Sequence, residues 1–410
     1  MNRQKILSSY LRIRKKTEIL VKDLRHEEMV VQTENFVSPI KWHLAHTTWF
    51  FENFVLKKFK RNYKTYDKDF NYLFNSYYNS AGKFNEKSKR GLFIWPLVSE
   101  VLKYRKKIDE MIIELIISDR LSDKSFFFIN LGLNHEQQHQ ELILMDILNI
   151  FSYFPQKKAF KKKKNKKINK ISKPLWSIHQ NVSFEYGFSG NQFSYDNEKP
   201  SGKKKLNPFK ISLNFITIGE WLEFIENKGY QDSKYWLSDG WDYINTNNIE
   251  RPMYWIDNKY EYTLCGIEKL DKNKPVSNIS FYEADAFCRF TKKRLPTEFE
   301  LEFFLKKNLV KGNFLESKNM TPISFDQNDA SSNSYGNVWC WTSSNYTPYV
   351  GYSSYKGDIG EYNKKFMCNQ FVLKGGSFAT PKSHIRASYR NYYYPNDRWQ
   401  FSGMRVAEDI

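Results

Sequence analysis

The chain lacks any long run of apolar residues. No stretch of 18 apolar residues occurs among its 410 residues, whereas a helix that spans a bilayer needs about 20. The opening sequence MNRQKILSSYLRIRKK also contains no apolar segment of the kind found in secretory signal peptides. These absences predict a cytoplasmic protein without a membrane partner.

Cysteine is scarce as well. The four cysteines are Cys265, Cys288, Cys340 and Cys368, and none of them belongs to a CxxC pair. Structural zinc sites usually show paired spacing of that kind. The sequence therefore predicts free thiols in an intracellular protein and gives no sign of a structural zinc site.

Acidic residues are outnumbered, and one segment has none. The chain contains 64 Lys and Arg against 45 Asp and Glu, a net charge of +19. Residues 157–173, KKAFKKKKNKKINKISK, hold ten lysines and no acid, and without them the balance is 54 against 45, or +9. We interpret this run as a solvated linker. A nucleic-acid-binding arm is the alternative, but no recognition motif accompanies the run, so we expect no nucleic-acid partner.

Aromatic residues are plentiful, and they indicate a folded chain: Phe, Tyr and Trp make up 17% of the sequence, and Trp alone occurs 11 times. In the first 155 residues, apolar positions recur every three or four residues, which predicts helices. The candidate helices are residues 17–29, 38–59, 96–118 and 126–151, with Pro39 in the first turn of the second. Four such helices around a loop-rich middle (residues 60–95) predict a helical bundle.

The amino-acid composition and the periodicity change after Pro174. Gly, Asn, Ser, Trp and Tyr dominate, and the periodic segments become short. Residues 218–229 and 281–293 are typical of isolated helices, whereas 371–378 and 401–409 are typical of short strands. We therefore predict a helical domain (1–155), a lysine-rich linker (156–173) and a loop-rich α+β domain (174–410).

Two histidines in NHEQQHQEL (residues 134–142) have the spacing of metal ligands. His135 and His139 are four residues apart, so in a helix they share one face at a separation of about 6 Å. A third ligand would come from another helix, and WHLAH (residues 42–46) offers His43 and His46. Imidazole ligands suit iron, zinc, copper and nickel, so the residues leave both the third ligand and the metal open.

The motifs taken together resemble a known family. SPIKWHLAHTTWFFE and HEQQHQEL resemble the DinB-like iron domain of ergothioneine-biosynthesis sulfoxide synthases of the EgtB type. WLSDGW, PVSNISFYEADAFCRF, KRLPTEFELE, GNVWCWTSS and FVLKGGSFAT resemble the formylglycine-generating-enzyme-like (sulfatase-modifying-factor) domain that completes those enzymes. The second domain lacks the paired cysteines of true formylglycine-generating enzymes, so modification of a sulfatase is not expected.

The resemblance implies a metal site and a reaction. The ligands of a non-haem Fe(II) ion would be His46, His135 and His139, with His43 only a neighbour. The family joins a thiol sulfur to the imidazole carbon of hercynine (trimethylhistidine), consumes O2 and leaves a sulfoxide. Three protein ligands leave open positions on the metal, where both substrates can be held together.

The branch of the family is indicated by a few positions. The γ-glutamylcysteine branch has its acid tyrosine three residues before the tyrosine that matches Tyr362, and here that position is Ile359. The same branch binds the glutamyl group with Asp and Arg where this chain has Tyr393 and Asp397. FNSYYN instead supplies Tyr77 and Tyr78, as in the cysteine branch, so we expect L-cysteine as the donor and one of these tyrosines as the proton donor.

Further residues are expected to contact substrates. Gln138 would hydrogen-bond hercynine or brace a histidine, and Asn391 would reach the betaine end. Tyr392 and Tyr393 would face the trimethylammonium group through cation–π attraction, with core packing as the alternative. The Arg that the cysteine branch has just before Pro96 is Trp95 here, which leaves Arg90 as the nearby cation for the thiol substrate's carboxylate.

Other functions fit the same motifs. A related synthase could use histidine, as in ovothiol synthesis, or γ-glutamylcysteine, or a selenium donor, as in selenoneine synthesis. A non-catalytic relative could bind a methylated amine or a metal, although the complete histidine set argues against that. A DNA-binding module would rest on the lysine run alone.

Overall fold

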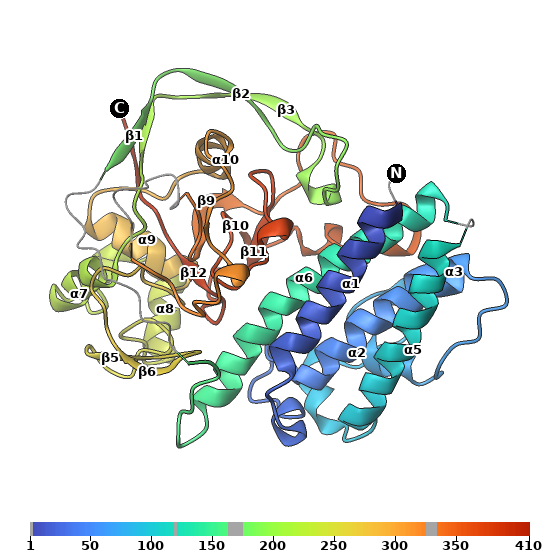
Figure 1. Cartoon of the computed structure of the whole chain (residues 1–410). Helices are drawn as coiled ribbons and strands as arrows, with labels where there is room; N and C mark the ends of the chain where they lie inside the picture. The colour runs from blue at the N-terminus through green and yellow to red at the C-terminus, as the bar shows by residue number, and fades with distance from the viewer. Residues whose placement is uncertain (1–2, 119–120, 163–174, 325–333) are drawn as a thin grey trace. The chain divides into compact units, whose positions relative to one another are not determined.

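The computed structural model describes residues 3–118, 121–162, 175–324 and 334–410 (Figure 1). The chain forms two compact units: the first contains residues 1–153 and 355–362, and the second contains residues 154–354 and 363–410. Most of the predicted linker, residues 163–173, lies outside the described residues. Among the helices of the described part, none is long and apolar enough to cross a membrane.

Four long helices make up the core of the first unit: α1 (Arg3–Val21), α2 (Ile40–Phe51), α5 (Val98–Ile117) and α6 (Asp123–Ser152). Helices α1 and α2 each pack against both α5 and α6, which confirms the predicted helical bundle (Figure 1). Local sequence explains the boundaries, since the Ser122 side chain caps α6 by accepting a hydrogen bond from the Ser125 backbone N–H.

Helix α2 carries part of the candidate metal site and is buried along its whole length. It continues through the π-helical turn η2 (Glu52–Leu56) into α3 (Lys57–Phe59). Such turns are rare and often occur near functional sites. Pro39 precedes the helix as its N-cap rather than lying in its first turn.

The prediction for the first helix is wrong in its bounds. The helix starts at Arg3 and ends at Val21, and only the 3-10 turn η1 (His26–Met29) follows, not a helix that continues to residue 29. The reason is the buried series Ile6, Tyr10, Ile13 and Thr17, which extends the helical spacing toward the N-terminus. The middle segment holds α4 (Phe70–Phe74) and the turns η3 (Asn79–Ala81) and η4 (Lys87–Leu92).

The second unit is rich in loops and short elements. Its helices are α7 (Ile218–Glu226), α8 (Ser238–Thr246), α9 (Phe281–Phe290) and α10 (Glu298–Lys306). One sheet has the order β1-β4-β13 and another the order β11-β10-β9-β12, and the remaining described strands pair as β2-β3, β5-β6 and β7-β8. The strand bounds are β1 Trp176–His179, β2 Val182–Tyr186, β3 Gly202–Leu206, β4 Phe209–Ser212, β5 Tyr260–Thr263, β6 Gly266–Lys269, β7 Gly312–Asn313, β8 Tyr335–Gly336, β9 Trp339–Asn345, β10 Phe371–Lys374, β11 Asn391–Tyr393, β12 Ser402–Gly403 and β13 Ala407–Asp409.

Short helices in this unit start at a recurring sequence signal. Thr217, Ser280 and Thr297 each stand three residues before a glutamate, and each pair forms a reciprocal capping box. The predicted helices at α7 and α9 and the predicted strand at β10 are present, whereas the predicted strand at residues 401–409 is two short strands, β12 and β13, in different sheets. Together with the helical first unit, they confirm the α+β class.

A segment from the second half of the sequence belongs to the helical unit. Residues 355–362 include the turn η9 (Gly357–Glu361), whose Asp358 pairs with Lys58 at 2.6 Å. The Glu361 carboxylate accepts hydrogen bonds from the backbone N–H groups of Asn79 and Ser80, at 3.2 and 3.0 Å. The sequence did not predict this return, and the proposed division at residues 155 and 174 stays a prediction.

Candidate metal centre

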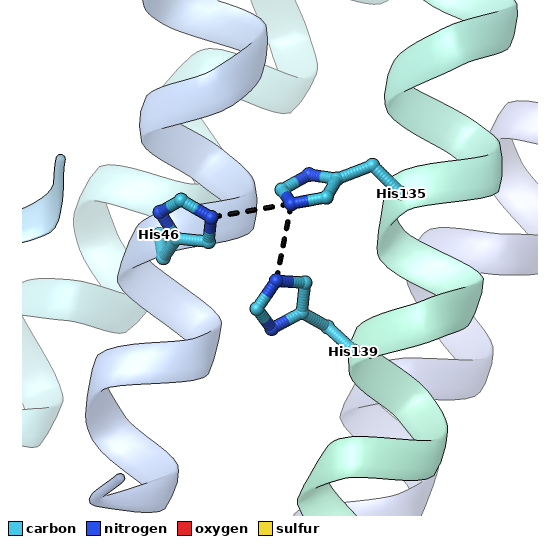
Figure 2. A group of neighbouring side chains, drawn as sticks. All are labelled: His46, His135 and His139. Carbon is cyan, nitrogen blue, oxygen red and sulfur yellow. Dashed lines mark hydrogen bonds between the residues drawn. The ribbon is translucent and has the colours of Figure 1, made fainter. Parts of the chain in front are cut away.

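Three buried histidines from two helices converge in the first unit. His46 comes from α2, and His135 and His139 lie one turn apart on α6 (Figure 2). The Nε2 atom of His135 is 3.2 Å from Nε2 of His46 and 3.1 Å from Nε2 of His139. All three side chains are at most 7% exposed. The i,i+4 spacing in the sequence thus produces a converging pair, His135 and His139, and His46 of α2 completes the cluster of three.

The geometry fits a metal ion. Zinc–imidazole bonds are about 2.0–2.1 Å long, so at that bond length two nitrogens at right angles around one ion lie about 3 Å apart. The candidate ligand atoms of the three residues all lie within 4.8 Å of one another. Nitrogens this close repel unless a proton or a cation lies between them, and one cation bound by all three lone pairs would satisfy the cluster.

The electrostatic environment keeps the imidazoles in the ligand-competent form. Burial lowers the pKa of His135 to about 3, and burial together with the neighbouring His135 holds the pKa values of His46 and His139 well below the usual range. A neutral imidazole has a lone pair to offer, whereas imidazolium has none. The three rings are therefore neutral at physiological pH and ready to bind a cation.

Each ring is held by its surroundings. His46 contacts the Phe74 carbonyl oxygen through Nδ1 at 2.6 Å and stacks on Trp42 with a centroid separation of 4.5 Å. His135 lies against Phe50, at 4.6 Å between centroids. His139 contacts His43 rather than a backbone group, with 2.8 Å between their Nδ1 atoms. The structure thus brings His46 into the cluster and places His43 behind it.

The two tyrosines predicted as proton donors lie together in the same unit. Tyr78 is fully buried and its ring contacts Phe54, whereas Tyr77 is half-buried and stacks on Tyr78 at 4.6 Å. The two hydroxyl oxygens are 3.5 Å apart. Tyr78 also contacts Trp49, which in turn stacks on His46, so a chain of rings links the pair to the histidine cluster.

Gln138 has a partner that the sequence did not single out. The Tyr362 hydroxyl donates to Gln138 Oε1 at 2.5 Å, and the Tyr362 ring lies 5.9 Å from the His135 ring. The Tyr77 hydroxyl in turn reaches the Tyr362 carbonyl oxygen at 3.3 Å. Tyr362 is distant in sequence from all these residues. The match between Tyr362 and a tyrosine of the γ-glutamylcysteine branch was the sequence signal that pointed to it.

Arg90 is buried behind an aromatic ring. Its guanidinium lies 3.4 Å from the Trp42 ring centroid, and His46 stacks on that same ring with nearly parallel planes. Two groups can approach one ring so closely only from opposite faces, so Trp42 separates Arg90 from His46. The expected role of Arg90 in holding a substrate carboxylate stays a prediction.

The remaining expected contact residues belong to the second unit. Asn391, Tyr392 and Tyr393 form strand β11, which pairs with β10. One face of the Tyr392 ring is covered by Tyr346, with 4.0 Å between centroids, and its hydroxyl donates to Asn363. Asn391 Oδ1 accepts from the Tyr392 backbone N–H.

Comparison with known proteins identifies two regions of the chain. Residues 9–143 match the model of the DinB superfamily, and residues 173–410 match the sulfatase-modifying factor enzyme 1-like domain. The structure of PvdO from Pseudomonas aeruginosa aligns with a TM-score of 0.41 and 18% identity, covering 60% of this chain and 100% of PvdO. That score is too low to support an inference about the fold.

Curated relatives with similar sequences are named hercynine oxygenases. The protein from Mycobacterium tuberculosis is 29% identical over 241 residues, which are 53% of this chain and 56% of that protein. The protein from Mycolicibacterium thermoresistibile is 25% identical over 320 residues, 71% of each chain. The chain thus spans little more than half the length of the first of these relatives. Because the domain model at residues 173–410 covers more than half of the sequence, the chain belongs to the sulfatase-modifying factor enzyme 1-like family and carries a DinB-superfamily region ahead of that domain.

Proposed function

We propose that the protein is a non-haem Fe(II)- and O2-dependent sulfoxide synthase. It forms a C–S bond between hercynine and L-cysteine and yields hercynylcysteine sulfoxide, a step in ergothioneine biosynthesis. The observation that carries the proposal is the buried, neutral triad of His46, His135 and His139. Its support from comparison is the similarity to hercynine oxygenases.

The triad would hold one Fe(II) through three Nε2 atoms. When bound, Fe(II) supplies the redox chemistry that activates dioxygen and a binding position for the thiol sulfur. The protein's own contribution is to hold both substrates in reach of each other and to limit the access of water. The buried helices α2 and α6 provide that rigid frame.

Proton delivery would fall to the tyrosine group. Tyr77 and Tyr78 are the first candidates, and Tyr362 lies close enough to His135 to be a third. Tyr362 also orients Gln138 by donating to its amide oxygen. An amide held in this way beside the ligands of α6 can position the imidazole or the carboxylate of hercynine.

Hercynine's quaternary ammonium would be recognised by aromatic rings of β11. Tyr346 covers one face of Tyr392, and Trp399 meets the Tyr393 ring in a T-shaped contact, so both rings are half-buried and are candidates for cation–π attraction. Asn391 would contact the betaine carboxylate. These assignments rest on the family resemblance at Asn391, Tyr392 and Tyr393.

Free cysteine is the preferred donor in this proposal. A donor that carries a γ-glutamyl group needs cationic and anionic partners, and the matching positions are Tyr393 and Asp397. The Asp397 carboxylate accepts a hydrogen bond from the Tyr394 backbone N–H at 3.0 Å and so stabilises the local turn. Because position 397 is Asp and not Arg, it has no cation to bind a glutamyl carboxylate.

The test is a substrate panel read by mass spectrometry. Protein loaded anaerobically with Fe(II) is mixed with O2 and with hercynine or histidine, each paired with cysteine, γ-glutamylcysteine or selenocysteine. The proposal predicts the highest kcat/KM for hercynine with cysteine. A preference for γ-glutamylcysteine would contradict free cysteine as the donor. A preference for histidine would contradict hercynine as the acceptor, and a preference for selenocysteine would contradict a sulfur donor. No product with any pair would contradict the enzymatic function.

A further inference from the structure

His43 occupies an unusual place behind the metal centre. Its Nδ1 atom lies 2.8 Å from Nδ1 of His139, and its Nε2 atom lies 2.7 Å from Asp146 Oδ2. His43 and Asp146 are both buried, at 3% and 2% exposure. His43 therefore bridges a carboxylate and a candidate ligand with both of its ring nitrogens.

Only one arrangement of protons satisfies the hydrogen bonds from His139 through His43 to Asp146 when a metal is bound and His43 is neutral. If His139 Nε2 gives its lone pair to a metal, the neutral ring carries its proton on Nδ1. That N–H must donate to His43 Nδ1, which leaves the proton of a neutral His43 on Nε2, and this second N–H donates to Asp146. Every hydrogen bond then points from the metal toward the carboxylate.

The carboxylate end of the chain is well anchored. Asp146 Oδ2 also accepts the Ser38 backbone N–H at 3.0 Å, and the Ser38 hydroxyl accepts from Arg90 Nη1 at 2.9 Å. The Arg90 guanidinium is close enough to Asp146 for their charges to attract. A fixed anion at this position, with a cation behind it, holds the His43 ring in one orientation.

The other two candidate ligands lack such support. His46 contacts a backbone carbonyl, and His135 Nδ1 has no hydrogen-bond partner among the described residues. An anionic partner behind an imidazole raises its basicity as a ligand more than a neutral carbonyl does. His139 differs from both in having a carboxylate, Asp146, behind it, reached through the ring of His43.

We propose that Asp146 and His43 form a hydrogen-bonded relay that fixes the Nδ1–H tautomer of His139 and strengthens its bond to the metal. His43 is a positioning residue and not a fourth ligand, because both of its nitrogens are engaged away from the Nε2 cluster. The inference rests on metal binding by the triad, and it adds two residues whose role no motif assigns.

Metal affinity of substitution variants tests the relay. His43→Leu removes both hydrogen bonds, whereas His43→Gln keeps an acceptor for His139 and a donor for Asp146 on one amide. Asp146→Asn removes the charge and keeps an acceptor. Ile147→Val, a buried change one residue away on α6, serves as the matched control. Fe(II) and Zn(II) affinity of each metal-free variant is measured by competition with a chelator, beside its thermal unfolding.

The relay predicts a graded result. His43→Leu should bind metal about 10–100-fold more weakly, which is the usual effect of removing an outer partner of a ligand. The metal affinity of Asp146→Asn should lie between those of His43→Leu and the wild type. His43→Gln should keep most of the wild-type affinity. Equal loss in the Gln and Leu variants with equal thermal stability would overturn the proposal. Wild-type protein that binds no metal would instead overturn the metal centre itself, so the two failures are distinguishable.

A spectroscopic readout checks the tautomers without relying on any variant. Zn(II)-loaded protein labelled with 15N-histidine should show a neutral histidine protonated at Nε2 whose signal disappears in His43→Gln, which assigns it to His43, and should show His139 protonated at Nδ1. A proton on His43 Nδ1 in the metal-loaded protein would contradict the proposed direction of the relay.

Discussion

The tyrosine group offers a test at the scale of single residues. Replacing both Tyr77 and Tyr78 with Phe removes two hydroxyl groups and keeps both rings, that of residue 78 packing against Phe54 and Trp49. If either is the proton donor, coupling should fall by about 10²–10⁴-fold, the usual contribution of a general acid. The oxidised thiol should then appear increasingly as cysteine sulfinate, measured by mass spectrometry against sulfoxide.

Two further variants complete that experiment. Tyr72→Phe changes an exposed tyrosine, 45% exposed, of the same unit and should leave the product ratio unchanged. Wild-type coupling in the double variant would exclude Tyr77 and Tyr78 as donors. Tyr362→Phe would then be the variant to examine, because its hydroxyl is next to Gln138.

A buried histidine of the second unit predicts the effect of acid on stability. Burial, together with the charge of Arg386, holds the pKa of His384 well below the usual range, so the folded protein keeps this ring neutral. The unfolded chain takes up a proton below about pH 6.5, and therefore stability is lost as the pH falls below that value. For a ring still neutral at pH 5, the loss between pH 7 and pH 5 is about 2 kcal/mol.

His384→Gln should remove that part of the pH dependence. Denaturant unfolding at pH 7 and pH 5 measures it, and the difference between the two pH values should shrink by about 2 kcal/mol in the variant. His26→Gln, an exposed histidine, is the control and should leave the difference as it is. An unchanged difference in His384→Gln would show that the ring is protonated in the folded state.

At the scale of elements, a buried charge network joins the helices of the first unit. Glu136 of α6 accepts from Arg14 of α1 at 2.6 Å, from Thr17 of α1 at 2.7 Å and from Arg105 of α5. Burial would raise the pKa of this carboxyl, but the charges of Arg105 and Arg14 outweigh it and lower the pKa to about 2. The carboxylate stays ionised and ties three helices together.

Removing this charge should be costly. Glu136→Gln removes the anion that pairs with the buried Arg105 and leaves Arg14 with Asp109 as its anionic partner. The loss of one partner from a buried pair costs about 3–5 kcal/mol. Denaturant unfolding of metal-free protein measures the change. Glu18→Gln, which breaks the exposed pair with Lys15, should cost under about 1 kcal/mol. Similar values for the two variants would contradict the structural role of the network.

Periodicity predicted α5 and α6 because their buried faces repeat along the chain. It also identified His135 and His139, since i,i+4 spacing is a local signal. Local spacing could not decide between His43 and His46 as the third ligand, because both lie on α2. The family resemblance made that choice. The contacts of Asp146 with His43 and of Tyr362 with Gln138 join distant parts of the sequence and leave no periodic trace.

At the scale of the whole molecule, we expect the lysine-rich run to be separable from the chemistry. Its first residues are anchored, because the Phe160 backbone N–H donates to the Leu264 carbonyl and the Tyr262 hydroxyl donates to the Lys158 carbonyl. Deleting residues 163–170 spares those contacts and every candidate site residue. Coupling activity should therefore stay within about twofold of wild type, since changes away from such contacts are usually small.

The same deletion variant addresses the alternative function. Retention on immobilised duplex DNA should be weak and abolished by moderate salt in both proteins, as for non-specific attraction between charges. Salt-resistant retention by the full chain that disappears on deletion, together with lost coupling, would show that the run has a function in nucleic-acid binding.

Iron content tests the central claim most directly. Protein loaded anaerobically with Fe(II) and then desalted should carry one iron per chain in the wild type and in the His26→Ala control. His46→Ala, His135→Ala and His139→Ala should each lose most of that iron while remaining folded, because each removes one of three ligands that converge from α2 and α6. Full iron occupancy in His46→Ala would contradict the triad, and His43 would become the candidate for the third ligand.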